Sequence, residues 1–244
     1  LKRYLGNGWV EADETWTYVS TDDPTGVFKV NADVTGKYSV GMRIKMTNGG
    51  NTIHGIITKV GTYGGDQSGY TYITFLHEID PADNLALHLM ANSAITNPYY
   101  SSMKAPQGFP LDPDKWRVFI NSGGGSQANP TTDVYYNIGS SISVPIGSWK
   151  LVGKIPVHIA RVTAAVFGFS GGFGTTNNAI TVTESFMFEY INNTDLISFT
   201  TIEAQVNVTS KTRYYMNFKT VYGSATVLEY FAFQPILVAT CAYL

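Results

Sequence analysis

Short runs of β-branched and aromatic residues alternate along the whole chain with turns built from glycine, asparagine and proline. The run 42–47 alternates strictly, with Met42, Ile44 and Met46 on one face and Arg43, Lys45 and Thr47 on the other. That period of two is typical of a half-buried strand. Residues 48–51 (Asn-Gly-Gly-Asn) then predict a hairpin turn, because asparagine and glycine tolerate positive φ. The repeated pattern predicts an all-β protein.

Prolines divide the chain. Four of them, Pro98, Pro106, Pro110 and Pro113, fall within residues 97–115, where the missing N–H groups disfavour a strand ladder. We therefore predict a small N-terminal antiparallel β-barrel over residues 1–98, a proline-rich connector over 99–115 and a C-terminal jelly-roll β-sandwich over 116–244. One short helix is expected at residues 82–92, after Asp80-Pro81.

Charge and cysteine content exclude several classes of protein. The 244 residues carry 16 Lys and Arg against 18 Asp and Glu, so a broadly basic nucleic-acid binder is excluded. Cys241 is the single cysteine, which rules out an internal disulfide and a cysteine-based zinc site. No run reaches 18 apolar residues, and no apolar segment follows Lys2-Arg3, so we expect neither membrane insertion nor a signal peptide.

Residues 8–116 resemble a module found in structural proteins of the virions of tailed bacteriophages. The resemblance is carried by Gly8-Trp9, by residues 12–18 (ADETWTY), by 22–24 (DDP), by 37–45 (KYSVGMRIK), by 95–101 (ITNPYYS) and by 104–113 (KAPQGFPLDP). It implies an attachment domain that binds other virion proteins and carries varied C-terminal domains outward. A location on the exterior of the particle follows as an expectation.

The C-terminal part is similar to the trimeric jelly-roll heads of the tumour-necrosis-factor and complement-globular kind, through residues 144–149, 209–220 and 239–244. This resemblance implies a homotrimer. Independently, several strands carry apolar residues at successive positions, so their second face needs a cover. The candidate trimer-interface residues are Phe186, Phe188, Tyr215, Tyr230, Phe231 and Phe233.

Signals for catalysis and for metal binding are weak. Residues 168–172 (GFSGG) match the G-x-S-x-G nucleophile elbow around Ser170, but a Gly/Asn loop follows instead of a helix and no histidine follows His158. The four histidines show no compact metal spacing, although His77 and His88 could approach one another. We predict no enzymatic activity, no cofactor and no metal.

Two loops rich in Gly, Ser, Asn and Thr, at 122–132 and 170–178, are candidate contact loops at one end of the sandwich, with plain solvent-exposed connections as the alternative. The candidate surface-binding residues are Ser122, Gly124, Ser126, Asn129, Ser170, Phe173, Thr176 and Asn177.

These features predict a phage virion structural protein: a tail or baseplate appendage whose head is a candidate binder of a host cell-surface glycan. A capsid head fibre or decoration protein is the alternative within the same class. A secreted carbohydrate-binding module is the alternative from another class, and a hydrolase with a distributed site is a third.

Overall fold

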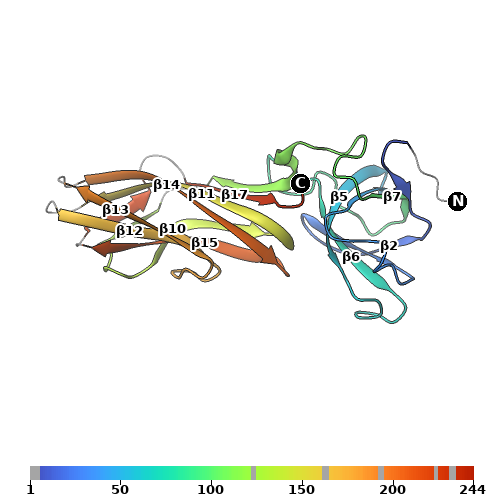
Figure 1. Cartoon of the computed structure of the whole chain (residues 1–244), viewed down its shortest axis with the longest axis horizontal. Coiled ribbons are helices and arrows are strands. Elements are labelled where there is room, and N and C mark those ends of the chain that lie inside the picture. The colour runs from blue at the N-terminus through green and yellow to red at the C-terminus, as the bar shows by residue number, and fades with distance from the viewer. Residues whose placement is uncertain (1–5, 122–124, 161–164, 192–194, 223–224, 231–234) are drawn as a thin grey trace. The chain divides into compact units, whose positions relative to one another are not determined.

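The computed structural model describes residues 6–121, 125–160, 165–191, 195–222, 225–230 and 235–244. Their regular secondary structure is strand apart from one short 3₁₀ helix, which confirms the all-β class (Figure 1). The chain packs into two units. The first contains Leu1–Arg117, Pro145–Ser148 and Cys241–Leu244, and the second contains Val118–Val144 and Trp149–Thr240.

The first unit is built on one curled seven-stranded sheet with the order β1-β7-β4-β5-β6-β3-β2 and antiparallel pairing throughout. Its strands are β1 (Val10–Glu11), β2 (Trp16–Asp22), β3 (Thr25–Val30), β4 (Arg43–Asn48), β5 (Asn51–Val60), β6 (Thr71–His77) and β7 (Ile95–Ser101). The predicted hairpin turn joins β4 to β5, with positive φ at Gly49 and Gly50.

Aromatic rings fill the inside of this curled sheet. Trp16 of β2 stacks on Phe28 of β3 with ring centroids 4.3 Å apart, and its edge meets Tyr38 at 6.0 Å. Tyr38 in turn meets Tyr100 of β7 at 5.3 Å, so rings connect strands from opposite ends of the strand order. Large rings of this kind supply most of the apolar area that a small β unit buries.

A polar network lies at the edge of this core. The Trp16 indole N–H donates to the Tyr38 hydroxyl at 3.2 Å, and Tyr38 donates to the Glu14 carboxylate. Lys37 Nζ also donates to Glu14, at 2.5 Å. Burial raises the pKa of Glu14, but the hydrogen bonds from Lys37 and Tyr38 outweigh it, and the pKa lies below its ordinary value. Glu14 therefore stays ionised and holds the segment before β2 to residues 37–38.

The predicted connector 99–115 is not a separate linker, because it packs onto the first unit. Trp9 donates its indole N–H to the Gln107 carbonyl at 2.8 Å, and Trp116 donates its own to the Pro110 carbonyl at 2.8 Å. Phe109 stacks on Trp116 with centroids 5.0 Å apart. The 3₁₀ helix η1 (Pro113–Trp116) ends the segment. Pro98 does not end the ladder as predicted, because it lies inside β7 at an irregularity in the pairing with β4. The rings among the other prolines bind the rest of the segment to the first unit.

The helix predicted at residues 82–92 is absent. That stretch forms turns with one bridge between Ile79 and Ala86. The backbone N–H of Ala86 binds the Asp23 carboxylate at 2.7 Å, and the N–H of Met90 binds His77 Nε2 at 3.2 Å. A helix would need these donors for its own carbonyls, so the side-chain acceptors win the competition.

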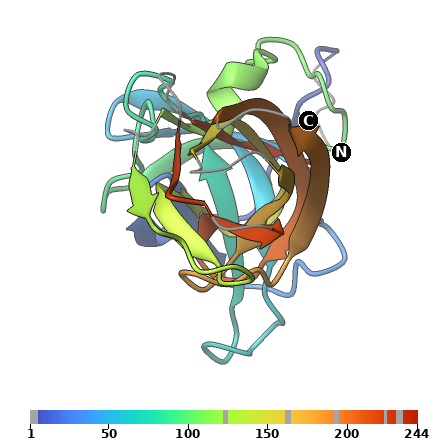
Figure 2. The same cartoon turned by 90° about the vertical axis from the view of Figure 1, so that its left-hand side faces the viewer.

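The second unit is a sandwich of two sheets with jelly-roll-like connections. Figure 2 looks roughly along its strands. One sheet has the order β10-β15-β12-β13, and the other has the order β8-β17-β11-β16-β9 with β14 paired to β11. Its strands are β8 (Arg117–Asn121), β9 (Ser126–Ala128), β10 (Tyr136–Val144), β11 (Gly147–Ala160), β12 (Ala165–Gly174), β13 (Thr183–Ile191), β14 (Asp195–Val208), β15 (Thr212–Tyr222), β16 (Val227–Tyr230) and β17 (Ile236–Cys241).

The two sheets of the second unit meet face to face. A side chain at Gly171 of β12 would lie 2.5 Å from the Phe218 ring of β15 and 3.3 Å from Ile202 of β14. Phe218 and Ile202 come from different sheets, and both are buried. Because Gly171 has no side chain, the two sheets can pack closely at this position.

Candidate binding surface

The sequence-predicted contact residues do not share one environment. Ser122 and Gly124 lie outside the described residues. Ser126 is exposed in β9, and Asn129 is exposed just after it, with φ of 45°. Ser126 therefore belongs to a strand and not to the predicted loop 122–132, whereas Asn129 does lie outside a strand.

The prediction that Ser170 and Phe173 lie in an exposed loop is wrong. Both lie inside β12, paired to β13 on one side and β15 on the other, and they are 0% and 1% exposed. The glycines around them predicted a loop, but Gly171 is there to admit the Phe218 ring. The nucleophile elbow also lacks its geometry, because that motif needs its serine exposed at a strand-to-helix turn.

Thr176 and Asn177 do lie on an exposed loop, residues 175–182 between β12 and β13. The loop is held by Asn217, a side chain of β15 that is 0% exposed. Its amide donates to the carbonyls of Ala179 at 2.6 Å and Thr176 at 3.3 Å, and it accepts from the Asn178 N–H at 3.0 Å. One buried amide thus fixes three positions of the loop.

A second segment, residues 129–137, lies against this loop. The Asn137 N–H donates to the Asn178 side-chain oxygen at 2.6 Å, and the Asn137 amide donates to the Met216 and Ser140 carbonyls, each at 2.8 Å. The Thr131 N–H binds the Tyr136 hydroxyl at 3.0 Å. The structure therefore joins the predicted loop 170–178 to Asn137 of β10, 41 residues away from Asn178 and beyond the end of the predicted loop 122–132.

We call residues 129–137 together with 175–178 the polar loop surface. Half-buried Tyr135 and Tyr136 add ring area to its amides and hydroxyls. Lys219 lies over the Tyr135 ring at 4.7 Å and 3.7 Å from the Asp133 carboxylate, so the two opposite charges offset one another. Amides, hydroxyls and tyrosine rings without a net charge suit a neutral, hydroxyl-rich ligand.

The candidate trimer-interface residues are mostly outside what the structure describes. Tyr215 is half-buried in β15. Phe231 and Phe233 lie outside the described residues, and so do the side chains of Phe186, Phe188 and Tyr230. The interface therefore stays a prediction.

The first unit contains a buried cation, Arg43, that the sequence pattern does not predict. Arg43 is 1% exposed, although alternation placed it on the solvent face of β4. It donates to the carbonyls of Gly41 at 2.6 Å, Lys104 at 3.1 Å and Tyr243 at 2.9 Å, and it lies over the Phe109 ring at 5.1 Å. Burial lowers its pKa. The segment 104–109 covers this face of β4, and local alternation could not reveal that cover.

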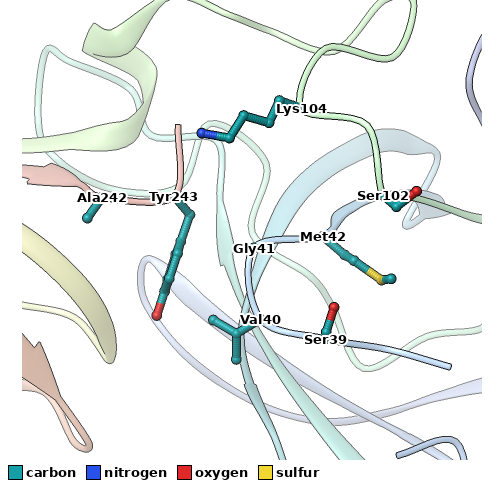
Figure 3. Close-up of a pocket in the computed structure, with 8 residues that line it drawn as sticks. All are labelled: Ser39, Val40, Gly41, Met42, Ser102, Lys104, Ala242 and Tyr243. Atoms are coloured by element: carbon teal, nitrogen blue, oxygen red, sulfur yellow. The ribbon is translucent and has the colours of Figure 1, made fainter. Parts of the chain in front are cut away.

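The three residues that Arg43 binds also line a pocket of about 330 Å³ (Figure 3). Val40, Met42, Ala242 and Tyr243 give it apolar contacts, and Ser39 and Ser102 add hydroxyl groups. Its charged side chain, Lys104, donates to the Leu244 carbonyl at 2.8 Å. Gly41 has φ of 88°, and the Tyr243 ring packs against it. Positive φ favours glycine here, so the shape of the pocket depends on that residue.

Two negative findings apply to the described part of the chain. No group of three His, Cys, Asp or Glu side chains among these residues could hold a metal ion. No helix among them is long and apolar enough to cross a membrane.

No protein-family model and no curated protein matches the sequence. Among solved structures, dimeric latent PorU from Porphyromonas gingivalis is similar at a TM-score of 0.27 and 11% identity, over 94% of this chain and 24% of that one. The structure of the infectious bursal disease virus Gx strain is similar at a TM-score of 0.31 and 10% identity, over 98% of this chain and 62% of that one. The Cry4Aa toxin of Bacillus thuringiensis is similar at a TM-score of 0.28 and 10% identity, over 94% of this chain and 52% of that one. This chain spans less than two thirds of each, and TM-scores of this size carry no conclusion about its function.

Proposed function

We propose that the chain is a structural protein on the exterior of a tailed-phage virion, a tail or baseplate appendage without enzymatic activity. The first unit binds other virion proteins. The second unit projects, and its polar loop surface binds a host cell-surface glycan. The chain acts as a homotrimer through its second unit, as the resemblance to trimeric jelly-roll heads implies.

One observation carries the proposal: the residues of the phage-module resemblance are those that build the first unit. Trp9 and Phe109 come from its first and last motifs and pack together at 6.4 Å. Glu14, Trp16 and Tyr38 come from the motifs between them and form the network at the edge of the core. The resemblance therefore follows one folded module rather than scattered matches.

The polar loop surface supports the glycan-binding role. Its backbone is fixed by Asn217 and Asn137, so the exposed Thr176 and Asn177 side chains are presented without a large ordering cost. Neutral hydroxyl-rich ligands are recognised by such amides and hydroxyls together with tyrosine rings.

Imaging tests the virion role. Purified particles of a phage that encodes the chain are labelled with an antibody against it and viewed by electron microscopy. We expect label at the tail or baseplate. Label on the capsid would favour a head fibre or decoration protein, and particles without the chain would contradict the proposal.

A glycan array with the full chain tests the ligand. We expect signal that Thr176→Ala and Asn177→Ala each reduce at least fivefold, while Glu203→Gln, an exposed change on β14, leaves it unchanged. Binding that none of these variants alters would move the ligand site away from the polar loop surface. Sedimentation of the full chain tests the homotrimer, and a monomer or a dimer at micromolar concentration would contradict it.

A further inference from the structure

Two asparagines of the first unit, Asn7 and Asn48, are each followed directly by a glycine. Such an asparagine can lose its side-chain amide without an enzyme. The glycine nitrogen is not shielded by a side chain, and the flexible glycine backbone lets it approach the asparagine Cγ atom. The two pairs are identical in sequence, but the structure gives them different surroundings. Those surroundings should decide which of the two is modified.

The side chain of Asn48 is held firmly. It lies at the end of β4, opposite Asn51 of β5, and is 2% exposed. Its Nδ2 atom lies 3.1–3.3 Å from the carbonyl oxygens of residues 91, 93 and 94. Its Oδ1 atom accepts from the Ala91 N–H at 2.7 Å. Both ends of the amide are thus occupied, and several hydrogen bonds must break before Cγ can turn toward the Gly49 nitrogen.

The side chain of Asn7 is held by much less. Asn7 is half-buried in a turn before β1 and belongs to no strand. Its Oδ1 atom accepts from the Trp9 N–H at 3.3 Å, and among the described residues its Nδ2 atom has no acceptor. The Gly8 N–H has no acceptor there either. The attacking nitrogen and the leaving nitrogen are therefore both free of the contacts that hold Asn48.

We propose that Asn7 is a site of spontaneous deamidation and that Asn48 is protected by its hydrogen bonds. The Gly8 nitrogen forms a bond to Cγ of Asn7, the bond from Cγ to Nδ2 breaks, and ammonia leaves with the proton that the Gly8 nitrogen gives up. Water then opens the resulting five-membered imide at either carbonyl, which gives aspartate or isoaspartate. Water is the only co-reactant. The inference stands on the first unit and does not rest on the virion role.

Deamidation of Asn7 acts on the segment that covers Arg43. The Asn7 carbonyl accepts from the Gln107 N–H at 2.9 Å, and the Trp9 indole donates to the Gln107 carbonyl at 2.8 Å. In isoaspartate the main chain runs through the former side chain and gains one methylene group between residues 7 and 8. The two contacts to Gln107 then no longer have matching spacing, so the segment 104–109 should open more often.

Peptide mass mapping of the full chain tests the site. The folded protein is incubated at mildly alkaline pH, and the conversion of each amide to an acid is followed by its mass gain. We expect Asn7 to convert at least about tenfold faster than Asn48, because Asn48 reacts only after its hydrogen bonds open. In guanidinium chloride the chain is unfolded and this protection is gone, so the two rates should agree within about twofold.

Three results would overturn the proposal. The first is Asn48 converting as fast as Asn7 in the folded chain. The second is an Asn7 that stays intact in the folded chain while the unfolded chain converts both. The third is a preference for Asn7 that persists unchanged in guanidinium chloride, because the selectivity would then come from neighbouring residues in the sequence and not from the fold.

Hydrogen exchange tests the effect on the cover of Arg43. In the aged chain the Gln107 N–H should exchange at least about threefold faster than in the fresh chain. Asn7→Gln is the matched control, because its longer side chain does not form the five-membered imide, and its exchange at Gln107 should not change with ageing. Equal exchange in the aged and fresh unmodified chains, or an equal increase in the aged Asn7→Gln chain, would contradict this effect.

Discussion

Two irregular stretches of the molecule, residues 102–117 in the first unit and 175–182 in the second, have similar turn-rich sequences but are held in different ways. The first is packed by aromatic rings, with Phe109 stacked on Trp116. The second is held by hydrogen bonds, three of them to the buried amide of Asn217 and one from the Asn137 N–H to Asn178. Turn residues therefore indicate where a chain leaves a sheet, and distant partners decide whether it stays ordered. We therefore expect that loss of a ring in the first stretch destabilises the whole unit. Loss of a hydrogen bond in the second stretch should open only that loop.

The largest expected effect comes from removing a ring of the first stretch. Trp116→Ala deletes a fully buried side chain and its hydrogen bond to the Pro110 carbonyl, which should cost about 3–5 kcal/mol of unfolding free energy. Urea unfolding of the full chain measures the loss. Leu111→Ala, 56% exposed in the same stretch, is the matched control and should change little. A loss below about 1 kcal/mol for Trp116→Ala would remove the distinction between the two stretches.

Acid should weaken the first unit through His77. Burial lowers the pKa of His77 to about 4 from 6.5, although its bond to the Pro24 carbonyl acts in the opposite direction. The unfolded chain binds this proton more tightly than the folded chain does, so a neutral His77 favours the folded state. That contribution to the unfolding free energy is complete above about pH 6.5 and is lost as the pH falls through 4. The loss should reach about 2 kcal/mol at pH 5 and about 3 kcal/mol in full.

Unfolding free energies at pH 7.5 and pH 5 check this expectation. His77→Asn should flatten the pH dependence of the unfolding free energy, and His88→Asn, a change at an exposed position, is the matched control. An unmodified chain that is equally stable at both pH values would mean that His77 is not held neutral.

The second stretch should respond to Asn217→Ala. Losing the amide leaves the carbonyls of Ala179 and Thr176 without that donor, which should lower the unfolding free energy by about 2 kcal/mol. Hydrogen exchange should speed up mainly in residues 174–179, and Asn177→Ala on the same loop should leave it unchanged. Uniformly faster exchange across the second unit would show that this loop is not an independently held element.

The smallest effect is expected for the ion pair between Lys150 of β11 and Glu203 of β14. Its atoms are 2.8 Å apart, but the side chains are 49% and 53% exposed, so water screens the attraction. A double-mutant cycle should give a coupling below about 0.5 kcal/mol. A larger value would mean that surface charge, and not only packing, holds β14 to its sheet.

The sequence was a good guide to strands and a poor guide to what covers them. Alternation in residues 42–47 correctly predicted β4 and the turn after it, because both depend on neighbouring residues. Alternation placed Arg43 on the correct face of β4 but predicted that this face is exposed, because the pattern contains no information about the distant residues 104–109 that bury it. The prediction of a loop at Ser170 was wrong for a related reason. In a sequence, a glycine that makes room for a neighbouring ring cannot be told from a glycine that forms a loop. The exposed loop at Thr176 and Asn177 was predicted correctly, and their role in binding stays a prediction. The anchor of this loop, Asn217, was not predicted because it lies 40 residues away from Asn177 in the sequence.

The bond from Arg43 to the Tyr243 carbonyl has a consequence for how the chain is made. Its partners are 200 residues apart, and ribosomes add about 5–20 residues per second. Tyr243 therefore leaves the ribosome roughly 10–40 seconds after Arg43. Throughout that interval the guanidinium lacks one of its carbonyl acceptors, and the second unit is synthesised before the first can be completed. The N-terminal unit can thus begin to fold first, but it cannot be completed until the second unit has been synthesised.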